Sequence, residues 1–212
     1  IQSMTKPITS LGIMMLVAEG RLGLDDPASR YLPGLADRAV LVRVDSSSRT
    51  VVTRPAVREI TIRDLLRHTS GIAYPFSSHE ALLLARHTDL ADRDFPLLHD
   101  PGTRWTYGMS TAHLGWIIEQ VTGMPLREFY QARIFGPLGM TNTSFSLPNA
   151  RIARLAVTYR WQQGAWHATP RPDSIHFDGR GDGGLLSTAE DYAKFVQLIL
   201  GNGSRGGARL LD

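Results

Sequence analysis

The chain has 212 residues and 42% hydrophobic content, which is enough to bury a core as one domain or as one domain with an added lobe. Its net charge is only +3, from 23 basic and 20 acidic residues, and no basic run provides a nucleic-acid footprint. It has no cysteine, which excludes disulfides, thiolate metal sites and a cysteine nucleophile but leaves the compartment open. No apolar stretch approaches the length of a membrane span.

The apolar residues of segment 1–20 recur at helical spacing and predict a helix. This helix is apolar on nearly all faces, so we expect it to be buried. Ser3 and Lys6 stand at its start, three residues apart, so their side chains share one face. Burial favours a neutral amine, which could take the proton of the Ser3 hydroxyl and activate it as a nucleophile. Pro7 suits only the first turn, so the helix is expected to start near Ser3. The alternative is an N-cap serine followed by a solvated lysine.

After this helix the sequence predicts surface structure and a hairpin. Residues 21–34 contain turn formers and a short helical piece. β-Branched residues then recur at 40–44 and 50–53, with Ser46 in the polar turn between them, and predict two paired strands. No internal repeat and no low-complexity segment interrupts the pattern.

Helical patterns fill the middle of the chain. Thr61 and Asp64 resemble a capping box at the start of one helix, and Gly71 is suited to stop it. Apolar residues at helical spacing predict another helix over 111–122, ended by Gly123. The remaining helical patterns cover residues 78–90 and 126–135.

The last part of the chain predicts a loop, a second hairpin and a final helix. Residues 137–140 are expected to form the loop and residues 157–166 the hairpin. Residues 179–184 formally match G-x-G-x-x-G, but residues 171–178 before them are not a convincing strand. A glycine-permissive turn is therefore favoured over a dinucleotide site. The final helix is expected over residues 188–200.

Five short motifs occur along the chain in a fixed order. They are Ser3-Met-Thr-Lys6, Leu65-Leu-Arg-His-Thr-Ser-Gly71, Pro101-Gly-Thr-Arg-Trp-Thr-Tyr107, Phe135-Gly-Pro-Leu-Gly-Met140 and Gly183-Gly-Leu-Leu-Ser-Thr-Ala-Glu-Asp-Tyr192. In this order they resemble the serine β-lactamase-like family, which includes class C β-lactamases, DD-peptidases and family VIII carboxylesterases. The resemblance covers essentially the whole chain and is closest to the family VIII carboxylesterases.

The resemblance implies an α+β fold of the β-lactamase/transpeptidase type, in which an antiparallel sheet is flanked by helices and carries a mainly helical lobe. A single domain is expected over residues 1–212, dominated by the catalytic helix (1–20) and by the mainly helical lobe with small hairpins (21–185). Residues 186–212 would return to the α/β part. The chain begins inside a motif and ends without a closing element, so an internal fragment truncated at both ends is expected. The third motif of the family would then lie beyond its C-terminus.

The same resemblance assigns Ser3, Lys6 and Tyr107 to catalysis. Ser3 would attack an acyl carbonyl and form an acyl-enzyme. Either Lys6 or a Tyr107 phenolate held by Lys6 would take the proton, and the residue types leave this choice open. Tyr107 would later protonate the leaving group and activate water. The Ser3 N–H would be one oxyanion donor, and the second is expected on a closing strand outside the chain.

The second motif departs from the pattern of penicillin-recognising members, which carry Tyr-x-Asn. Here Met109 takes the place of the asparagine and offers no strong hydrogen-bonding group, so discrimination for amide substrates should fall. Tyr107 with Ser110 also resembles the Tyr-x-x-Ser pattern of family VIII esterases. The sequence predicts a carboxylesterase for small acyl esters, with Met109, Ser110 and Trp105 as substrate contacts. The alternatives are a class C-type β-lactamase or DD-peptidase, and a catalytically silent penicillin-binding-like relative.

The expected partner is a small-molecule ester or lactam. No cofactor, metal, nucleic acid or membrane span is expected: the seven histidines show no ligand spacing, and His79-Glu80 lacks the second histidine of a zinc protease. Trp105 is expected to pack near Tyr107 or to line the pocket, and His113 to lie on the surface or in the lobe. The oligomeric state, and a cytoplasmic or periplasmic location, are left open.

Overall fold

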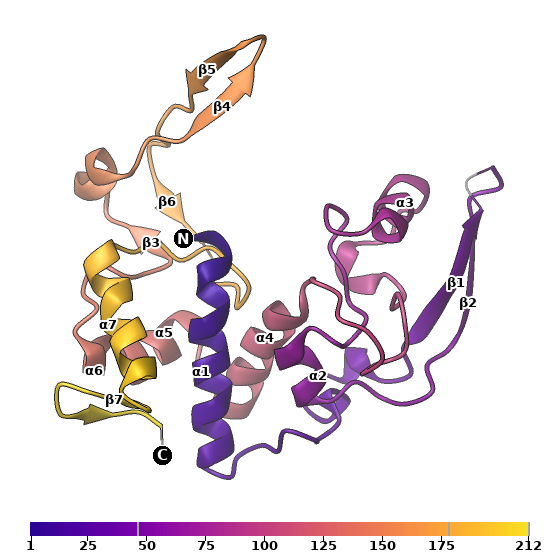
Figure 1. The fold of residues 1–212 in the computed structure, drawn as a ribbon, viewed down its shortest axis with the longest axis horizontal. Coiled ribbons are helices and arrows are strands. Elements are labelled where there is room, and N and C mark those ends of the chain that lie inside the picture. The colour runs from indigo at the N-terminus through magenta and orange to yellow at the C-terminus, as the bar shows by residue number, and fades with distance from the viewer. Residues whose placement is uncertain (46, 178, 212) are drawn as a thin grey trace.

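The computed structural model describes residues 1–45, 47–177 and 179–211. Ser46, Asp178 and Asp212 lie outside the described residues, so the turn of the first predicted hairpin and the segment before the glycine-rich turn are described only in part. Figure 1 shows one long helix in the middle of the molecule, shorter helices on both sides of it, and hairpins that project from the body.

Helices make up most of the regular structure. They are α1 (Thr5–Ala18), α2 (Ile62–Arg67), α3 (His79–His87), α4 (Ser110–Thr122), α5 (Leu126–Tyr130), α6 (Gly136–Leu138) and α7 (Ala189–Leu200). A π-helical stretch, Gln131–Phe135, joins α5 to α6, and 3-10 turns cover Gln2–Met4, Ala28–Arg30, Pro33–Leu35, Asp92–Asp94 and Asn149–Arg154. The strands are β1 (Ala39–Asp45), β2 (Thr50–Pro55), β3 (Ser146–Leu147), β4 (Tyr159–Gln162), β5 (Ala165–Ala168), β6 (Ile175–His176), β7 (Ser204–Arg205) and β8 (Ala208–Arg209).

Helix α1 is the centre of the fold. The 3-10 turn Gln2–Met4 leads directly into it, which confirms the predicted start near Ser3. Ile8, Ile13 and Leu16 are completely buried. Helices α2 and α4 lie on one side of α1, and α5 and α7 lie on the other (Figure 1). A helix that is apolar on most faces needs neighbours on most faces, and this arrangement supplies them.

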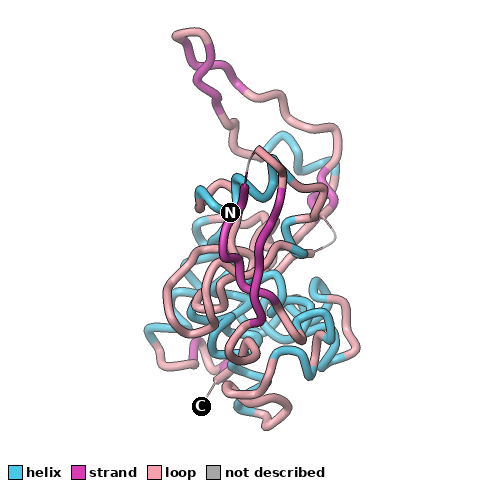
Figure 2. Tube along the Cα trace, turned by 90° about the vertical axis from the view of Figure 1, so that its right-hand side faces the viewer, coloured by secondary structure: helices cyan, strands magenta, loops and turns pink. Residues whose placement is uncertain are grey.

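Both predicted hairpins are confirmed. β1 pairs antiparallel with β2, with a register irregularity between Leu41 and Arg43. β4 pairs antiparallel with β5, and its Trp161 lies edge to face against Trp166 at 5.3 Å between ring centroids. The β4–β5 hairpin projects from the top of the molecule in Figures 1 and 2, and β1–β2 faces the viewer in Figure 2. Among the described residues the strands pair only in twos, as predicted for a chain dominated by helices with small hairpins.

Helix α2 ends earlier than the sequence predicts. Gly71 is the predicted stop, but the helix ends at Arg67 and His68 caps it in the left-handed conformation, with φ at 56°. The His68 N–H donates to carbonyl oxygens of the last helical turn, which offsets the unfavourable backbone angle of a non-glycine residue. Gly71 lies in the following turn, where a Cβ would stand 2.5 Å from the His99 carbonyl oxygen.

The segment after α4 is more helical than the sequence predicts. Gly123 ends α4 with φ at 70°, as expected. The helix predicted over 126–135 changes from α5 into the π-helical stretch, and the predicted loop at 137–140 begins inside α6. Gly139, with φ at 66°, ends α6, so the loop prediction is correct only after this residue.

Helix α7 follows the glycine-rich turn and lies beside α1 (Figure 1). The Thr188 hydroxyl caps it by accepting a hydrogen bond from the Asp191 N–H at 3.2 Å, and the Tyr192 hydroxyl donates to the Met4 carbonyl oxygen at 3.0 Å.

That the whole chain forms a single domain stays a prediction. In the described ranges, no helix has both the length and the apolar character needed to cross a membrane.

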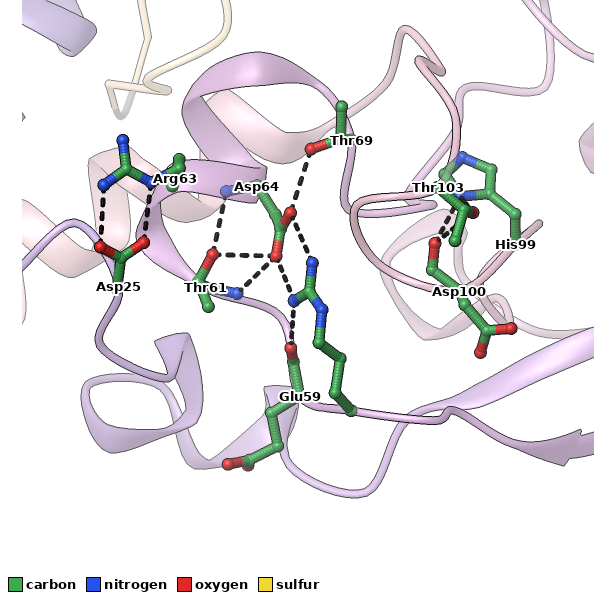
Figure 3. Close-up of polar contacts among 10 residues, drawn as sticks. Asp25, Glu59, Thr61, Arg63, Asp64, Thr69, His99, Asp100 and Thr103 are labelled. Carbon is green, nitrogen blue, oxygen red and sulfur yellow. Dashed lines mark hydrogen bonds and ion pairs between the residues drawn. The ribbon is translucent and has the colours of Figure 1, made fainter.

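Asp64 organises the start of α2 (Figure 3). Thr61 and Asp64 form the predicted capping box: the Asp64 N–H donates to Thr61 Oγ1 at 3.2 Å, and the Thr61 N–H donates to the Asp64 carboxylate at 3.0 Å. Arg58 also donates to this carboxylate at 2.6 and 3.0 Å, and the Thr69 hydroxyl donates at 3.1 Å. Burial acts to raise the pKa of Asp64, but the hydrogen bonds from Arg58 and Thr61 outweigh it and lower the pKa below its usual value.

Asp64→Asn is expected to reduce the free energy of unfolding by about 2–3 kcal/mol, because charge-assisted hydrogen bonds are lost while half-exposed Arg58 can still reach water. Since the folded pKa is lowered, the stabilisation is present above the ordinary carboxyl pKa of 3.8 and is lost as the pH falls through the folded value. Urea unfolding of the protein and the variant at several pH values measures this. Asp25→Asn is the control, because Asp25 is 75% exposed in its pair with Arg63 (Figure 3). Equal losses in the two variants would contradict the prediction.

Candidate active site

Ser3, Lys6 and Tyr107 meet at the N-terminal end of α1. The Lys6 Nζ donates to the Ser3 Oγ at 3.1 Å, and the Tyr107 hydroxyl donates to the same oxygen at 2.5 Å. Ser3 lies in the 3-10 turn and Lys6 in the first turn of α1, so their spacing places both side chains on one face. Tyr107 arrives from the loop before α4. A hydroxyl with an amine and a phenol in hydrogen-bond reach can act as an activated nucleophile.

Lys6 is almost completely buried, with 8% of its surface exposed. Besides Ser3, its Nζ donates to the Asp182 carbonyl oxygen at 2.8 Å and to the Tyr74 hydroxyl oxygen at 3.4 Å. It also lies 4.9 Å from the ring centroid of Tyr107 and 5.5 Å from that of Tyr74. The three donors of the ammonium group therefore have acceptors, and two aromatic faces add to its stabilisation.

The two tyrosines that flank Lys6 have opposite electrostatic environments. Burial acts to raise the pKa of Tyr107, but the hydrogen bond with Ser3 and the contact with the Lys6 ammonium outweigh it and lower the pKa. For Tyr74, burial and the adjacent Asp182 carboxylate both raise the pKa. Tyr107 is therefore the phenol that ionises more easily. Both Lys6 and Tyr107 contact the Ser3 Oγ, so a Tyr107 phenolate or a neutral Lys6 amine could take its proton.

Close packing holds Tyr107 in place. A Cβ on the next residue, Gly108, would stand 2.0 Å from the Ile72 carbonyl oxygen, so only glycine allows this approach. The Ser77 hydroxyl donates to the Tyr107 carbonyl oxygen at 2.7 Å. The ring of His68 lies 5.0 Å from that of Tyr107, and burial, together with the charge of Lys6, lowers the pKa of His68 to about 4. A neutral imidazole therefore packs against the phenol near neutral pH.

The predicted substrate contacts occupy different environments. Trp105 is 64% exposed and stacks on Tyr107 at 6.1 Å between ring centroids. Met109 is 7% exposed at the start of α4, and Ser110 is completely buried with its Oγ 2.8 Å from that of Ser70. Trp105 thus lies beside the site, whereas Met109 and Ser110 are packed in the interior. A direct contact between any of them and a substrate stays a prediction.

His113 lies in the lobe, one of the two positions expected for it. Its side chain is buried in α4 against Trp116, and its Nδ1 lies 3.1 Å from the Met109 carbonyl oxygen. Burial lowers the pKa of His113 to about 4, so it is neutral at physiological pH.

A cavity of about 660 Å³ opens beside Ser3. Its walls carry the apolar side chains of Phe76, Ile175 and Phe177, together with Arg180 and Asp182. Apart from Ser3, the residues of the wall are Ile1, Gln2, Tyr74, Phe76, Ile175, Phe177, Gly179, Arg180, Asp182, Gly183, Gly184, Leu185 and Leu186. Such a mainly apolar cavity next to a nucleophile is suited to hold a small organic molecule.

Sequence reasoning missed Tyr74, Arg180 and Asp182. Tyr74 follows the Leu65–Gly71 motif, and the other two lie inside the glycine-rich segment that the sequence predicts as a turn. The structure agrees with a turn, in which the Gly183 N–H donates to the Arg180 carbonyl oxygen at 3.4 Å. The Gly181 carbonyl oxygen also accepts from the Thr9 hydroxyl of α1 at 2.5 Å. Among the described residues, no group of three or more His, Asp or Glu side chains is placed to hold a metal ion.

The helical arrangement around α1 and the Ser3–Lys6–Tyr107 cluster agree with the resemblance that the five motifs carry. A family model described as Beta-lactamase matches residues 1–211, and the chain belongs to this family. Its fold is the β-lactamase/transpeptidase-like fold that the motifs predict.

Among individual proteins, Protein Rv1367c from Mycobacterium tuberculosis is 39% identical over 100% of this chain and 56% of its own length. Lovastatin esterase from Penicillium rubens is 32% identical over 95% of this chain and 55% of its own length. The solved structure of simvastatin synthase from Aspergillus terreus, a LovD6 mutant, has a TM-score of 0.85 and 30% identity over 100% of this chain and 53% of that chain. The chain thus spans about half the length of the curated relatives it matches.

Tyr107 is expected to be the first tyrosine to ionise in an alkaline titration followed by tyrosinate absorbance, below the usual pKa of 10.0. Tyr107→Phe should remove this first step. Lys6→Met should move it to higher pH, because the ammonium that stabilises the phenolate is gone. Tyr31→Phe is the matched control, since burial and Asp26 raise the pKa of Tyr31. A first step that persists in Tyr107→Phe would refute the assignment.

Proposed function

We propose that the protein is a serine hydrolase that acts through an acyl-enzyme, and that its substrates are small carboxylic esters. The observation that carries the proposal is the Ser3 Oγ within 3.1 Å of the Lys6 Nζ and 2.5 Å of the Tyr107 hydroxyl. No other pair of contacts in the described residues gives a serine hydroxyl both an amine and a phenol.

In this mechanism the Ser3 Oγ attacks the ester carbonyl carbon while its proton passes to ionised Tyr107, either directly or by way of a neutral Lys6 amine that hands it on to Tyr107. The C–O bond of the tetrahedral intermediate then breaks, and Tyr107 donates a proton to the departing alkoxide. Water attacks the acyl-Ser3 carbonyl with Tyr107 as the base, which releases the carboxylic acid and returns the proton to Ser3. The lowered pKa of Tyr107 suits it to accept and return a proton.

Two observations support an ester in preference to a lactam or peptide. Met109, where penicillin-recognising members carry an asparagine, is buried and presents no amide to a substrate. The cavity beside Ser3 has apolar walls at Phe76, Ile175 and Phe177, which suit the hydrocarbon part of an ester. The similarity to lovastatin esterase adds to this support.

Hydrolysis of a short-chain p-nitrophenyl ester is expected to fall at least about 10³-fold in Ser3→Ala, because the nucleophile is lost. Ser10→Ala, on the same helix, is the matched control and should retain activity. A chromogenic cephalosporin assayed in parallel tests the alternative. Faster turnover of the cephalosporin than of the ester would move the protein to the β-lactamases. Absence of turnover with both, in a folded protein, would favour a silent binding relative.

A further inference from the structure

The glycine-rich turn carries a polar cluster around the buried Asp182 carboxylate, and the mechanism above does not use it. The Asp182 side chain is only 5% exposed, and it forms a bidentate ion pair with Arg180 at 2.8 and 3.0 Å. The Tyr74 hydroxyl donates to the second oxygen of this pair, Asp182 Oδ2. A carboxylate in such a position requires several donors, and Arg180 and Tyr74 provide them.

This cluster reaches Lys6 by two routes. The Asp182 carbonyl oxygen accepts from the Lys6 Nζ at 2.8 Å, so the backbone of the turn holds the amine directly. Through the side chain, Asp182 fixes the hydroxyl proton of Tyr74 toward itself, which leaves the phenol oxygen free to accept from Lys6 at 3.4 Å. The hydrogen bonds therefore run in one direction, from Lys6 to Tyr74 to Asp182.

We propose that Arg180 and Asp182 are positioning residues: together they orient Tyr74, hold Lys6 against Ser3, and balance each other's charge beside Tyr107. The part of this inference that concerns turnover rests on the proposed function. The part that concerns Tyr107 does not, because it applies to the folded protein without substrate.

The charges around Tyr107 determine how the Arg180–Asp182 ion pair affects the ionisation of this tyrosine. The groups that act on it are Ser3 and Lys6 from the start of α1, His68 from the end of α2, Tyr74 from the loop after α2, and the Asp182 carboxylate from the glycine-rich turn. Arg180 acts on Tyr107 through its ion pair with that carboxylate. His68, like His113 in α4, has a pKa lowered to about 4 and is neutral where Tyr107 titrates. Lys6 stabilises the phenolate, whereas the carboxylate of Asp182 opposes it, so Arg180 is needed to compensate for that carboxylate.

The two members of the ion pair should consequently act in opposite directions. In Asp182→Asn a negative charge is removed, so Tyr107 should ionise at lower pH, by a few tenths of a unit to about one unit. In Arg180→Gln the carboxylate is no longer compensated, so Tyr107 should ionise at higher pH by a similar amount. Loss of packing alone would not shift the two variants in opposite directions.

Two readouts separate this inference from the proposed function. The first is the tyrosinate absorbance titration, which needs no activity. The second is the acidic limb of kcat/KM for the p-nitrophenyl ester, which should move in the same directions, with kcat reduced about 10-fold or more in both variants. If the wild-type protein hydrolyses no ester, the absorbance titration still tests the positioning role.

Asp182→Glu and Arg180→Lys keep the charges and guard against variants that fail to fold; both should leave the Tyr107 titration near its wild-type position. Arg63→Gln and Asp25→Asn, which break a bidentate surface pair with contacts at 2.7 and 2.8 Å, are the matched controls and should change neither readout. Shifts in the same direction in Asp182→Asn and Arg180→Gln, or no shift in either folded variant, would overturn the proposal.

Discussion

The interaction on which the site depends is the burial of one amine. Lys6 is 8% exposed inside a mostly apolar helix, and a buried ammonium is stable only when each of its donors has an acceptor. Its acceptors are Ser3, Asp182 and Tyr74, which come from the start of α1, the glycine-rich turn and the loop after α2. The requirement of one side chain therefore joins three segments that are distant in sequence. These same segments form the wall of the cavity beside Ser3.

Small residues allow these segments to come close enough. A Cβ on Gly12 would meet Ile118 of α4 and Phe129 of α5 at 3.0 Å, so α1 packs tightly on both helices. A Cβ on Gly181 would lie 2.3 Å from the Thr111 carbonyl oxygen, so the glycine-rich turn rests directly on α4. The backbone of this turn can then bring the Asp182 carbonyl oxygen to Lys6. Glycines outside the Ser3–Lys6–Tyr107 cluster therefore help to set its geometry.

Local signals in the sequence predict a large part of this arrangement. The three-residue spacing of Ser3 and Lys6 and the capping box at Thr61 are short-range features, and both are confirmed. Tyr107 could be found because its motif stands in a known order relative to Ser3. Tyr74 and Asp182 could not, because their roles arise only when the loop after α2 and the glycine-rich turn meet over Lys6.

The difference between short-range signals and long-range contacts also explains where the sequence predictions are wrong. Gly71 is a typical helix stop, but α2 ends earlier, with His68 in the left-handed conformation. There the Thr69 N–H donates to the Asp64 carbonyl oxygen at 2.9 Å, and the distant Thr106 N–H donates to the His68 carbonyl oxygen at 2.8 Å. Tertiary hydrogen bonds thereby override a local preference. As a consequence, His68 lies at the end of the shortened helix, with its ring against the ring of Tyr107.

The buried position of Met109 fits the same view of the site. The Lys6 ammonium needs no partner from Met109, because Tyr74 and the Asp182 carbonyl oxygen accept the two protons that do not point to Ser3. Met109 instead packs in the main core beside Ser110, whose hydroxyl bonds to Ser70. Met109 can therefore replace the asparagine of the Tyr-x-Asn pattern without leaving the Lys6 charge unpaired. The replacement removes a polar group with which the amide of a substrate could have formed hydrogen bonds.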